Sequence, residues 1–478
     1  MSATTDHLQP TSLEGLDEAD LAARSEAVGE PDWLRDRRLT AYKTWVDQRW
    51  PQLRGDEYWK DTPFTRFTID TSIVHADGLV DPVRSPLLDT IELAGSAQIR
   101  SGRTVIVGCD QAQAQGVVVT TLRRAAEEHP DLVREHLGSL TEGRDRTVTA
   151  NDAAWTSGLF VYIPPEVELE DPIGISIQAR TPGVHLPRVL VVADRHTKAS
   201  IYLEHVSDVD EPTTVDEVCE IVALDGASLD VVSIQDWSGP VGHIAMQGAA
   251  LHRDASMRHL TVTIGGETVR MRPEVRLVGP GSTIEPLGVY FSDEGQHFEH
   301  HPYIEHVAGH AVSDVLYKGA LQGHSRTVFR GHIYVHKDAV GSDSNEVNKS
   351  LILTPGARAD STPFLEIECS EVTAGHGSAT GQIDREHLFY LRSRGLSAEQ
   401  ALRLVVFGFF AEVLDRIAAP EVKERTMAHI ETEIDRADLA AIAARREQFV
   451  PAESDEAAAG GRELPKDGVA PLTPGGEA

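Results

Sequence analysis

The sequence contains little cysteine and no long hydrophobic run. Its three cysteines, Cys109, Cys219 and Cys369, lie far apart, so they offer neither a disulfide framework nor a Cys-x-x-Cys metal site, and they fit a reducing compartment. No apolar stretch reaches the length needed to span a membrane, and residues 1–13 lack the basic and apolar segments of a secretory signal. We therefore expect a soluble, cytoplasmic protein with no membrane partner.

Basic residues are scarce relative to acidic ones. Lys and Arg number 44 against 75 Asp and Glu, which gives a formal net charge of −31. Such a chain repels a phosphate backbone, so general nucleic-acid binding is excluded. The sequence also has no Gly-x-x-x-x-Gly-Lys-Ser/Thr loop and no Gly-x-Ser-x-Gly elbow. We therefore expect neither ATP hydrolysis by this chain alone nor serine-hydrolase chemistry.

Short β-type runs separated by Gly, Asp, Pro and Ser fill the middle of the chain. A turn-like word recurs among them, with its alanines 28 residues apart: Lys198-Ala199-Ser200, Gly226-Ala227-Ser228 and Asp254-Ala255-Ser256, followed by Gly281-Ser282. Repetition at a fixed period is typical of a solenoid, because one coil cannot bury its own apolar face. We predict a mainly β fold built on a right-handed parallel β-helix.

Helical patterns flank this region. At the C-terminal side, Ser397 and Gln400 form a capping box ahead of an apolar stripe. The predicted organisation is an N-terminal helical region and lead-in (1–103), a mixed connecting segment (104–146), the β-helix core (147–395), a C-terminal helical region (396–450) and an acidic tail (451–478). The tail has no aromatic residue, so we expect it to be disordered.

His376 is the first candidate for chemistry. Gly375 and Gly377 flank it, so the backbone can approach another surface closely and the imidazole can project without bulky neighbours. Imidazole is a suitable ligand for ferrous iron or the edge of an iron–sulfur cluster. The alternative is a histidine at a strand end that is satisfied by backbone carbonyls.

A second candidate is the histidine-rich stretch 296–310. Its candidate metal ligands are His297, His300, His306 and His310. Histidine and glutamate are the ligand types of a divalent metal site, but their spacing here matches no known motif. On strands, His297 and Glu299 would share one face, and His300 and His306 the other. Stacked polar ladders of the β-helix are the alternative, and the spacing favours them.

Several longer words resemble the SufB/SufD family of iron–sulfur cluster assembly proteins. The most specific are residues 375–384, GHGSATGQID, and 388–395, LFYLRSRG, which look like SufD rather than SufB. The resemblance continues, in the expected order, through residues 29–45, 153–164, 314–319, 328–331 and 347–353. Two positions depart from the family pattern. Many relatives have cysteine where this chain has Ala374, and Ser350 replaces an asparagine.

This resemblance implies a non-catalytic scaffold subunit of the SUF complex. Such a subunit would pair with a SufB-like subunit through the β-helix and with a SufC-like ABC-type ATPase through the C-terminal helices. His376 would support iron acquisition and nascent cluster assembly at the interface, where iron or a cluster is held only transiently. No cofactor is expected to stay bound to the chain alone. Cys369 lies an odd number of residues from His376, on the opposite strand face, so no thiolate contribution is expected.

The same resemblance suggests residues for partner binding. They lie near and within the predicted C-terminal helix: Arg392, Arg394, Phe409, Phe410 and Val413. An internal core is the alternative for the apolar ones.

Two other functions remain open at this point. One is a β-helix carbohydrate-active enzyme, a lyase or esterase, which would need convergent acids or bases in a groove and is usually secreted. The other is a SufB-like scaffold that holds a cluster unaided, and the absence of paired cysteines counts against it.

Overall fold

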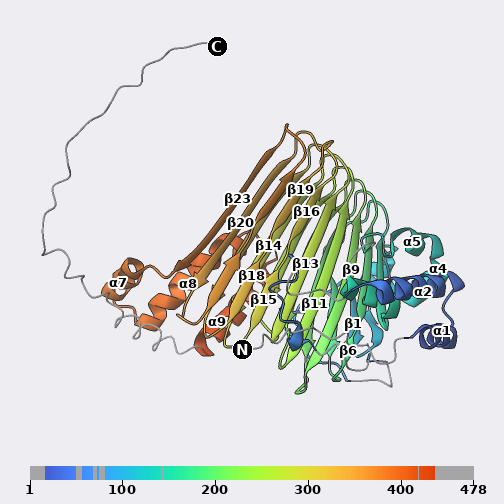
Figure 1. The fold of residues 1–478 in the computed structure, drawn as a ribbon, viewed down its shortest axis with the longest axis horizontal. Coiled ribbons are helices and arrows are strands. Elements are labelled where there is room, and N and C mark those ends of the chain that lie inside the picture. Colours follow the sequence, from blue (N-terminus) through green and yellow to red (C-terminus); the bar gives the residue numbers. More distant parts are fainter. Residues whose placement is uncertain are drawn as a thin grey trace, which may run out of the picture.

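The computed structural model describes residues 17–49, 56–67, 73–74, 81–141, 145–417 and 419–436. Its centre is a parallel β-solenoid of about eight turns. N-terminal helices lie at one end of it, and C-terminal helices lie along its side (Figure 1). The predicted mainly β fold and its stacked parallel coils are confirmed. The predicted acidic tail, residues 451–478, lies outside the described residues.

Two sheets form the walls of the solenoid. The first contains, in spatial order, β2 (Arg103–Gly108), β1 (Gly95–Arg100), β5 (Ile173–Ala179), β8 (Lys198–Ser207), β10 (Ser228–Asp236), β12 (Ser256–Thr263), β14 (Thr283–Ser292), β17 (Val312–Leu321), β20 (Asp343–Ile352) and β23 (Thr373–Gln382). The second contains β3 (Val118–Thr121), β4 (Ser157–Ile163), β7 (Pro187–Ala193), β9 (Thr213–Ala223), β11 (Val241–Leu251), β13 (Thr268–Leu277), β15 (His297–His300), β18 (Arg326–Phe329) and β21 (Arg358–Ser361). It is extended by β6 (Val184–His185), β16 (Tyr303–His306), β19 (His332–Val335) and β22 (Phe364–Ile367).

The coils stack in register, and the repeated turn word marks two of them. Ser228 pairs with Ser256, 28 residues further on, as the repeat predicted. The first copy of the turn word, at residues 198–200, is not in register with the second copy. Ala199 lies opposite Leu229 rather than Ala227, because the coil that begins at β8 is slightly longer than the next. Equal spacing of similar words therefore identified the architecture but not the exact register.

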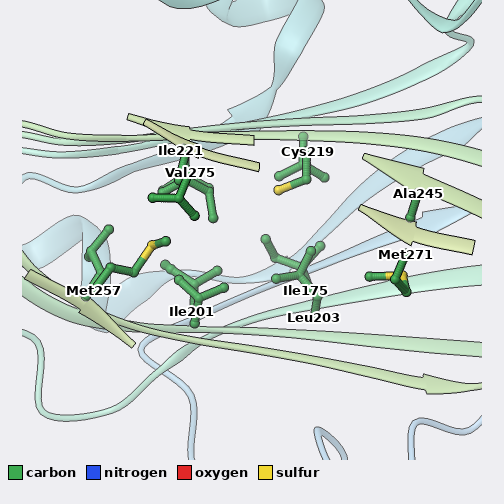
Figure 2. Packing of buried hydrophobic residues seen from close by; sticks show 14 of the residues in the cluster. Ile175, Ile201, Leu203, Cys219, Ile221, Ala245, Met257, Met271 and Val275 are labelled. Carbon is green, nitrogen blue, oxygen red and sulfur yellow. The ribbon is translucent and has the colours of Figure 1, made fainter. Parts of the chain in front are cut away.

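Alternate side chains of both sheets point into the solenoid and form its core. Figure 2 shows Cys219, Ile221 and Val275 of the second sheet facing Ile201 and Met257 of the first. All five are buried. The outer faces are largely covered as well, so β9 and β11 are buried along their whole length. This is why their sequences show little alternation of polar and apolar residues.

The N-terminal part closes one end of the solenoid (Figure 1). It contains α1 (Glu18–Ala27), α2 (Asp32–Asp47), the 3-10 turn η1 (Phe64–Arg66), α3 (Asp110–Ala114), α4 (Leu122–Glu128), α5 (Pro130–His136) and α6 (Arg146–Ala154). Antiparallel pairing of β1 with β2 and of β3 with β4 ends both parallel ladders here. Because β1 pairs in parallel with β5, the sheet begins at Gly95, well before the predicted core boundary at 147.

Three helices follow the last strand: α7 (Arg385–Ser393), α8 (Ala398–Leu414) and α9 (Pro420–Arg436). Asp384 caps α7, which therefore starts inside the predicted core segment 147–395. The capping box of Ser397 and Gln400 is confirmed at the start of α8. Helix α8 packs on the outer face of the first sheet, against β14 and β17. Among the described helices, none is long and apolar enough to cross a membrane.

Candidate functional site

The solenoid is open at the end formed by β23 (Figure 1). Strand β23 pairs with β20 and with no other described strand. Its residues are exposed or half-buried throughout, and those of β22, in the opposite wall, are too. An edge strand of this length presents a row of unpaired backbone N–H and C=O groups. This end can therefore accept a strand from another chain.

Strand β23 places His376 over the interior of the solenoid. His376 pairs in register with Glu346 of β20, which pairs with Val315 of β17. Val315 belongs to the interior core, and aligned residues of parallel strands share a face. His376 and Glu346 therefore point inward too, but His376 is exposed because it lies on the last described coil. Neighbouring strands are about 4.8 Å apart, so the two residues are cross-strand neighbours in the same inward-facing row.

Glu346 is buried beneath the open end. Its side chain is 1% exposed, and its Oε1 has no hydrogen-bond partner among the described residues. Gly331 makes room for it, because a Cβ at that position would come within 2.1 Å of Glu346 Oε2. Burial raises the pKa of Glu346 to about 8, so the carboxyl group is mostly protonated at neutral pH. The site thus combines an exposed imidazole with a buried carboxylic acid.

We expect Glu346→Gln to stabilise the isolated chain at alkaline pH. Below pH 4.5 the carboxyl group is protonated in both the folded and the unfolded chain, so the substitution has little effect there. As the pH rises from 4.5 through about 8, only the unfolded chain loses the proton freely, and the wild-type free energy of unfolding falls. The amide avoids this loss, which is on the order of 3–5 kcal/mol above pH 8. Urea unfolding at pH 5, 7 and 8.5 measures the difference.

The matched control for this substitution is Glu371→Gln, at an exposed position just before β23. It should leave the pH dependence of unfolding unchanged. Equal free energies of unfolding for wild type and Glu346→Gln at pH 8.5 would show that the carboxyl group of Glu346 ionises normally in the folded chain.

The described thiols do not lie beside His376. Ala374 pairs with Ser344 in the same inward row as His376, so the cysteine that many relatives carry there would adjoin the imidazole. Cys369 instead lies before β23 and packs into the main core. Glu346 and His376 therefore give this end oxygen and nitrogen donor atoms.

The outward-facing residues of the histidine-rich stretch form a hydrogen-bonded cluster. His297 Nε2 lies 2.7 Å from Glu299 Oε1, which confirms that the two share a face. Glu299 Oε2 accepts hydrogen bonds from Arg270 Nη1, at 2.7 Å, and from Thr62 Oγ1, at 2.8 Å. Burial favours the neutral acid, but the hydrogen bonds of His297 and His301 and the charge of Arg270 hold the pKa of Glu299 well below its usual range. These contacts attach the N-terminal segment to the solenoid.

The inward-facing histidines take part in polar ladders. His300 Nε2 lies 3.0 Å from Thr263 Oγ1, and His306 Nε2 lies 2.9 Å from Ser313 Oγ. His310 is exposed in a turn, with a φ of 59°. Within the part of the chain that the structure describes, no three of the four predicted ligands bring donor atoms within 4.8 Å of one another. The geometry therefore favours the ladder interpretation of this stretch.

The predicted partner-binding residues separate into exposed and buried groups. Arg392 and Arg394 are exposed, and Phe409 is half-buried. Phe410 and Val413 are fully buried between α8 and the first sheet. Contrary to the prediction, their side chains are therefore not part of the outer surface. A helix that packs on a sheet turns its most apolar stripe inward, and the sequence alone could not show which side that was.

Sequence reasoning missed several residues at this end. Phe389, Tyr390 and Leu404 are large apolar side chains that are 76%, 56% and 52% exposed. Phe389 and Tyr390 lie within the sequence LFYLRSRG, most of which belongs to α7, and they are on a side of this helix that no described element covers. Glu346 precedes His376 by one coil, but the 28-residue period of the repeated word points to Asn348 instead, so only the observed register identifies it.

Comparison with known proteins identifies the class. A family model described as the SufBD core domain of the SUF system for iron–sulfur cluster assembly matches residues 176–409, and one described as the SufBD protein N-terminal region matches residues 107–175. An iron–sulfur cluster assembly SufBD family protein of Mycobacterium leprae is 39% identical over 335 residues, which cover 68% of this chain and 84% of that protein.

Two further relatives extend the match. A SufBD family protein of Mycobacterium tuberculosis is 37% identical over 389 residues, covering 80% of this chain and 88% of the relative. The iron–sulfur cluster assembly protein SufD of Bacillus subtilis is 27% identical over 440 residues, covering 88% and 98%. The chain belongs to the SufBD family of iron–sulfur cluster assembly proteins and is SufD-like within it.

Proposed function

We propose that this chain is a non-catalytic, cytoplasmic scaffold subunit of a SUF complex. Through the open end of its solenoid it pairs with a SufB-like subunit, and through its C-terminal helices it binds a SufC-like ABC-type ATPase. Iron and the nascent cluster are cargo at the first interface, and neither stays bound there in the chain alone. The observation that carries the proposal is the edge strand β23, which pairs with β20 alone among the described strands and on which His376 faces inward.

The glycines beside His376 support the first interface. Neither Gly375 nor Gly377 has a positive φ, and a Cβ at either position would meet only ordinary contacts, at 4.0 and 3.9 Å. The fold of this chain therefore does not require glycine at these positions. A partner that packs closely against the outer side of β23 would require it, because any side chain there would hold the two backbones apart.

His376 and Glu346 supply the chemistry of this interface. Imidazole nitrogen and carboxylate oxygen both bind ferrous iron, and the adjacent strands hold them side by side. An arriving cation would favour the ionised form of Glu346, whose pKa burial raises to about 8. Iron capture would then release a proton. The remaining ligands would come from the SufB-like subunit.

The second interface is assigned to the exposed surface of α7 and α8. A groove between these helices and the ends of β20 and β23 is lined by Tyr390, Leu404 and Phe409, among others. Exposed apolar residues gathered in this way are typical of a docking surface. Arg392 and Arg394 flank it, and Arg394 stacks on Tyr390 with its guanidinium carbon 5.2 Å from the ring centre. Arginine and tyrosine are enriched at protein interfaces.

The test of the pairing uses the double variant Gly375→Val and Gly377→Val. Valine is compatible with a strand, so the variant should fold, but it should lose at least tenfold in co-purification with the SufB-like subunit when SufB-like, SufC-like and this chain are co-expressed. The control is Gly108→Val in β2, at the closed end, where a Cβ meets nothing within 4 Å. Unchanged co-purification of the double variant would place the SufB-like subunit elsewhere.

Family membership favours this function over the two alternatives. A lyase or esterase would require a different class of protein, and the family matched here is one of cluster assembly. A scaffold that holds a cluster unaided would need thiolates at the open end, where Ala374 stands.

A further inference from the structure

A cluster of metal-binding side chains lies deep inside the solenoid, away from the open end. It consists of His205 on β8, Glu217 on β9 and His243 on β11, and all three are 0% exposed. Figure 2 shows Cys219 pointing into the core from β9. Glu217, two residues earlier on the same strand, points the same way. The cluster is therefore enclosed between the two sheets.

The ligand atoms of these residues converge. Glu217 Oε2 lies 2.5 Å from His205 Nε2 and 3.2 Å from His243 Nε2, and all three atoms lie within 4.8 Å of one another. The indole ring of Trp237 packs against both imidazoles, at 5.4 and 5.2 Å between ring centres. Gln247 Nε2 donates to the other carboxylate oxygen of Glu217, at 3.0 Å, and orients it.

The hydrogen bonding of His205 leaves a lone pair facing a carboxylate. Its Nδ1 lies 3.0 Å from the carbonyl oxygen of Ile234, an acceptor, so the proton of a neutral ring sits on Nδ1. Nε2 then carries a lone pair that points at Glu217 Oε2, which also has only lone pairs to offer. A buried contact of this kind is unfavourable unless a cation lies between the two atoms. That cation is either a second proton on His205 or a metal ion.

We propose that His205, Glu217 and His243 bind one divalent first-row transition ion, such as Fe²⁺ or Zn²⁺, inside the solenoid. Two imidazoles and one carboxylate are a common ligand set for such ions. Donor atoms about 2.1 Å from one ion stand roughly 3–3.4 Å apart, a separation that His243 and Glu217 already have. The His205 pair must open by about 0.5 Å. The Nδ1 contact of His205 to a carbonyl is the support that metal-binding histidines usually have.

Polar side chains connect this cluster with the middle of the solenoid interior. Gln247 Nε2 also donates to Ser233 Oγ, at 2.9 Å. Ser233 accepts from Gln235, at 2.7 Å, and Gln235 accepts from Thr263, at 2.9 Å. Within an apolar core, such a continuous hydrogen-bonded row satisfies its own polar groups and holds Gln247 in place beside Glu217.

The row continues toward the open end. Thr263 contacts His300, as described above, and the His300 ring stacks on Tyr290 with 4.7 Å between ring centres. The Tyr290 hydroxyl donates to Asn348 on β20, at 3.1 Å, and Asn348 donates to half-buried Ser361, at 3.0 Å. The interior cluster is thus linked, through hydrogen bonds and one ring contact, to the coils next to His376.

The experiment measures metal bound to the full-length chain. The protein and its His376→Ala variant are stripped with a chelator and titrated anaerobically with Co²⁺, whose visible absorption reports nitrogen and oxygen ligation, and the bound metal is counted by mass spectrometry. We expect about one ion per chain in both proteins. Glu217→Gln and His243→Gln should reduce occupancy at least tenfold. His306→Gln, which alters a buried inward-facing histidine that contacts Ser313 rather than this cluster, should not.

A second measurement does not depend on whether the variants of the cluster fold. Co²⁺ should raise the thermal unfolding midpoint of the stripped wild-type chain and of His376→Ala alike, because an ion bound only by the folded state stabilises it. No Co²⁺ bound and no rise in the midpoint would mean that the cluster holds a proton only and would overturn the proposal. Binding that disappears in His376→Ala would assign the ion to the open end and would overturn it too.

Discussion

Replacing His376 by alanine is expected to lower the activity of a reporter iron–sulfur enzyme at least tenfold in a strain that lacks the native subunit. The imidazole is exposed at the open end, so its removal should change the free energy of unfolding by about 1 kcal/mol or less. It nevertheless removes the imidazole that we propose this chain offers as a ligand at the interface. Since Ala374 stands where many relatives have cysteine, no neighbouring thiol can replace the imidazole.

The controls for this prediction separate chemistry from folding. His324→Ala removes another exposed histidine, which lies in a turn far along the coil from β23, and should rescue fully. His376→Cys supplies a different iron ligand and should retain part of the activity. Full rescue by His376→Ala at normal abundance would remove this residue from cluster assembly. A loss that followed protein abundance would assign it a structural role.

Acidification is expected to unfold the chain near pH 5. Burial lowers the pKa of His185, His259 and His306 to about 4, and of His300 to about 3 despite the opposing charge of Glu299. In the unfolded chain they titrate near 6.5. Their contribution is complete above pH 6.5 and is lost as the pH falls toward the folded values. At pH 5 the loss is roughly 2 kcal/mol for each histidine, which together approaches the whole stability of a typical domain.

The measurement is the free energy of unfolding in urea between pH 7.5 and 4.5. His300→Gln should shift the acid midpoint downward, because a side chain that cannot gain a proton no longer favours the unfolded state. His387→Gln changes a histidine whose side chain is 72% exposed and should leave the midpoint in place. A chain equally stable at pH 7 and 5 would mean that the buried histidines can take up protons in the folded state.

The architecture could be predicted from the sequence because every coil has to meet the same structural requirements. Each must turn at nearly the same place and bury one face on its neighbours, so Ser228 and Ser256 recur at matching positions. The register of the first copy of the turn word could not be predicted. A small change in coil length places Ala199 opposite Leu229, and the sequence of the word itself does not change.

The candidate site was predicted only in part, because most of its residues are brought together by strand pairing between distant parts of the sequence. His376 stood out because of its flanking glycines. The partnership of Glu346 with it depends on cross-strand pairing, and the convergence of His205, Glu217 and His243 depends on three strands from both walls. No short motif records contacts of this kind. The dense run of histidines at 296–310 is far more conspicuous in the sequence, but its members lie on opposite faces of their strands.

The open end also sets where the molecule is least stable. In a stack of coils each coil is held by its two neighbours, but the coil that carries β23 has a neighbour on one side only among the described residues. Its local opening therefore costs the least free energy, and docking of a second stack would supply the missing neighbour. Assembly would then order the coil that presents His376, so that the histidine is held firmly only when a partner is there to share its cargo.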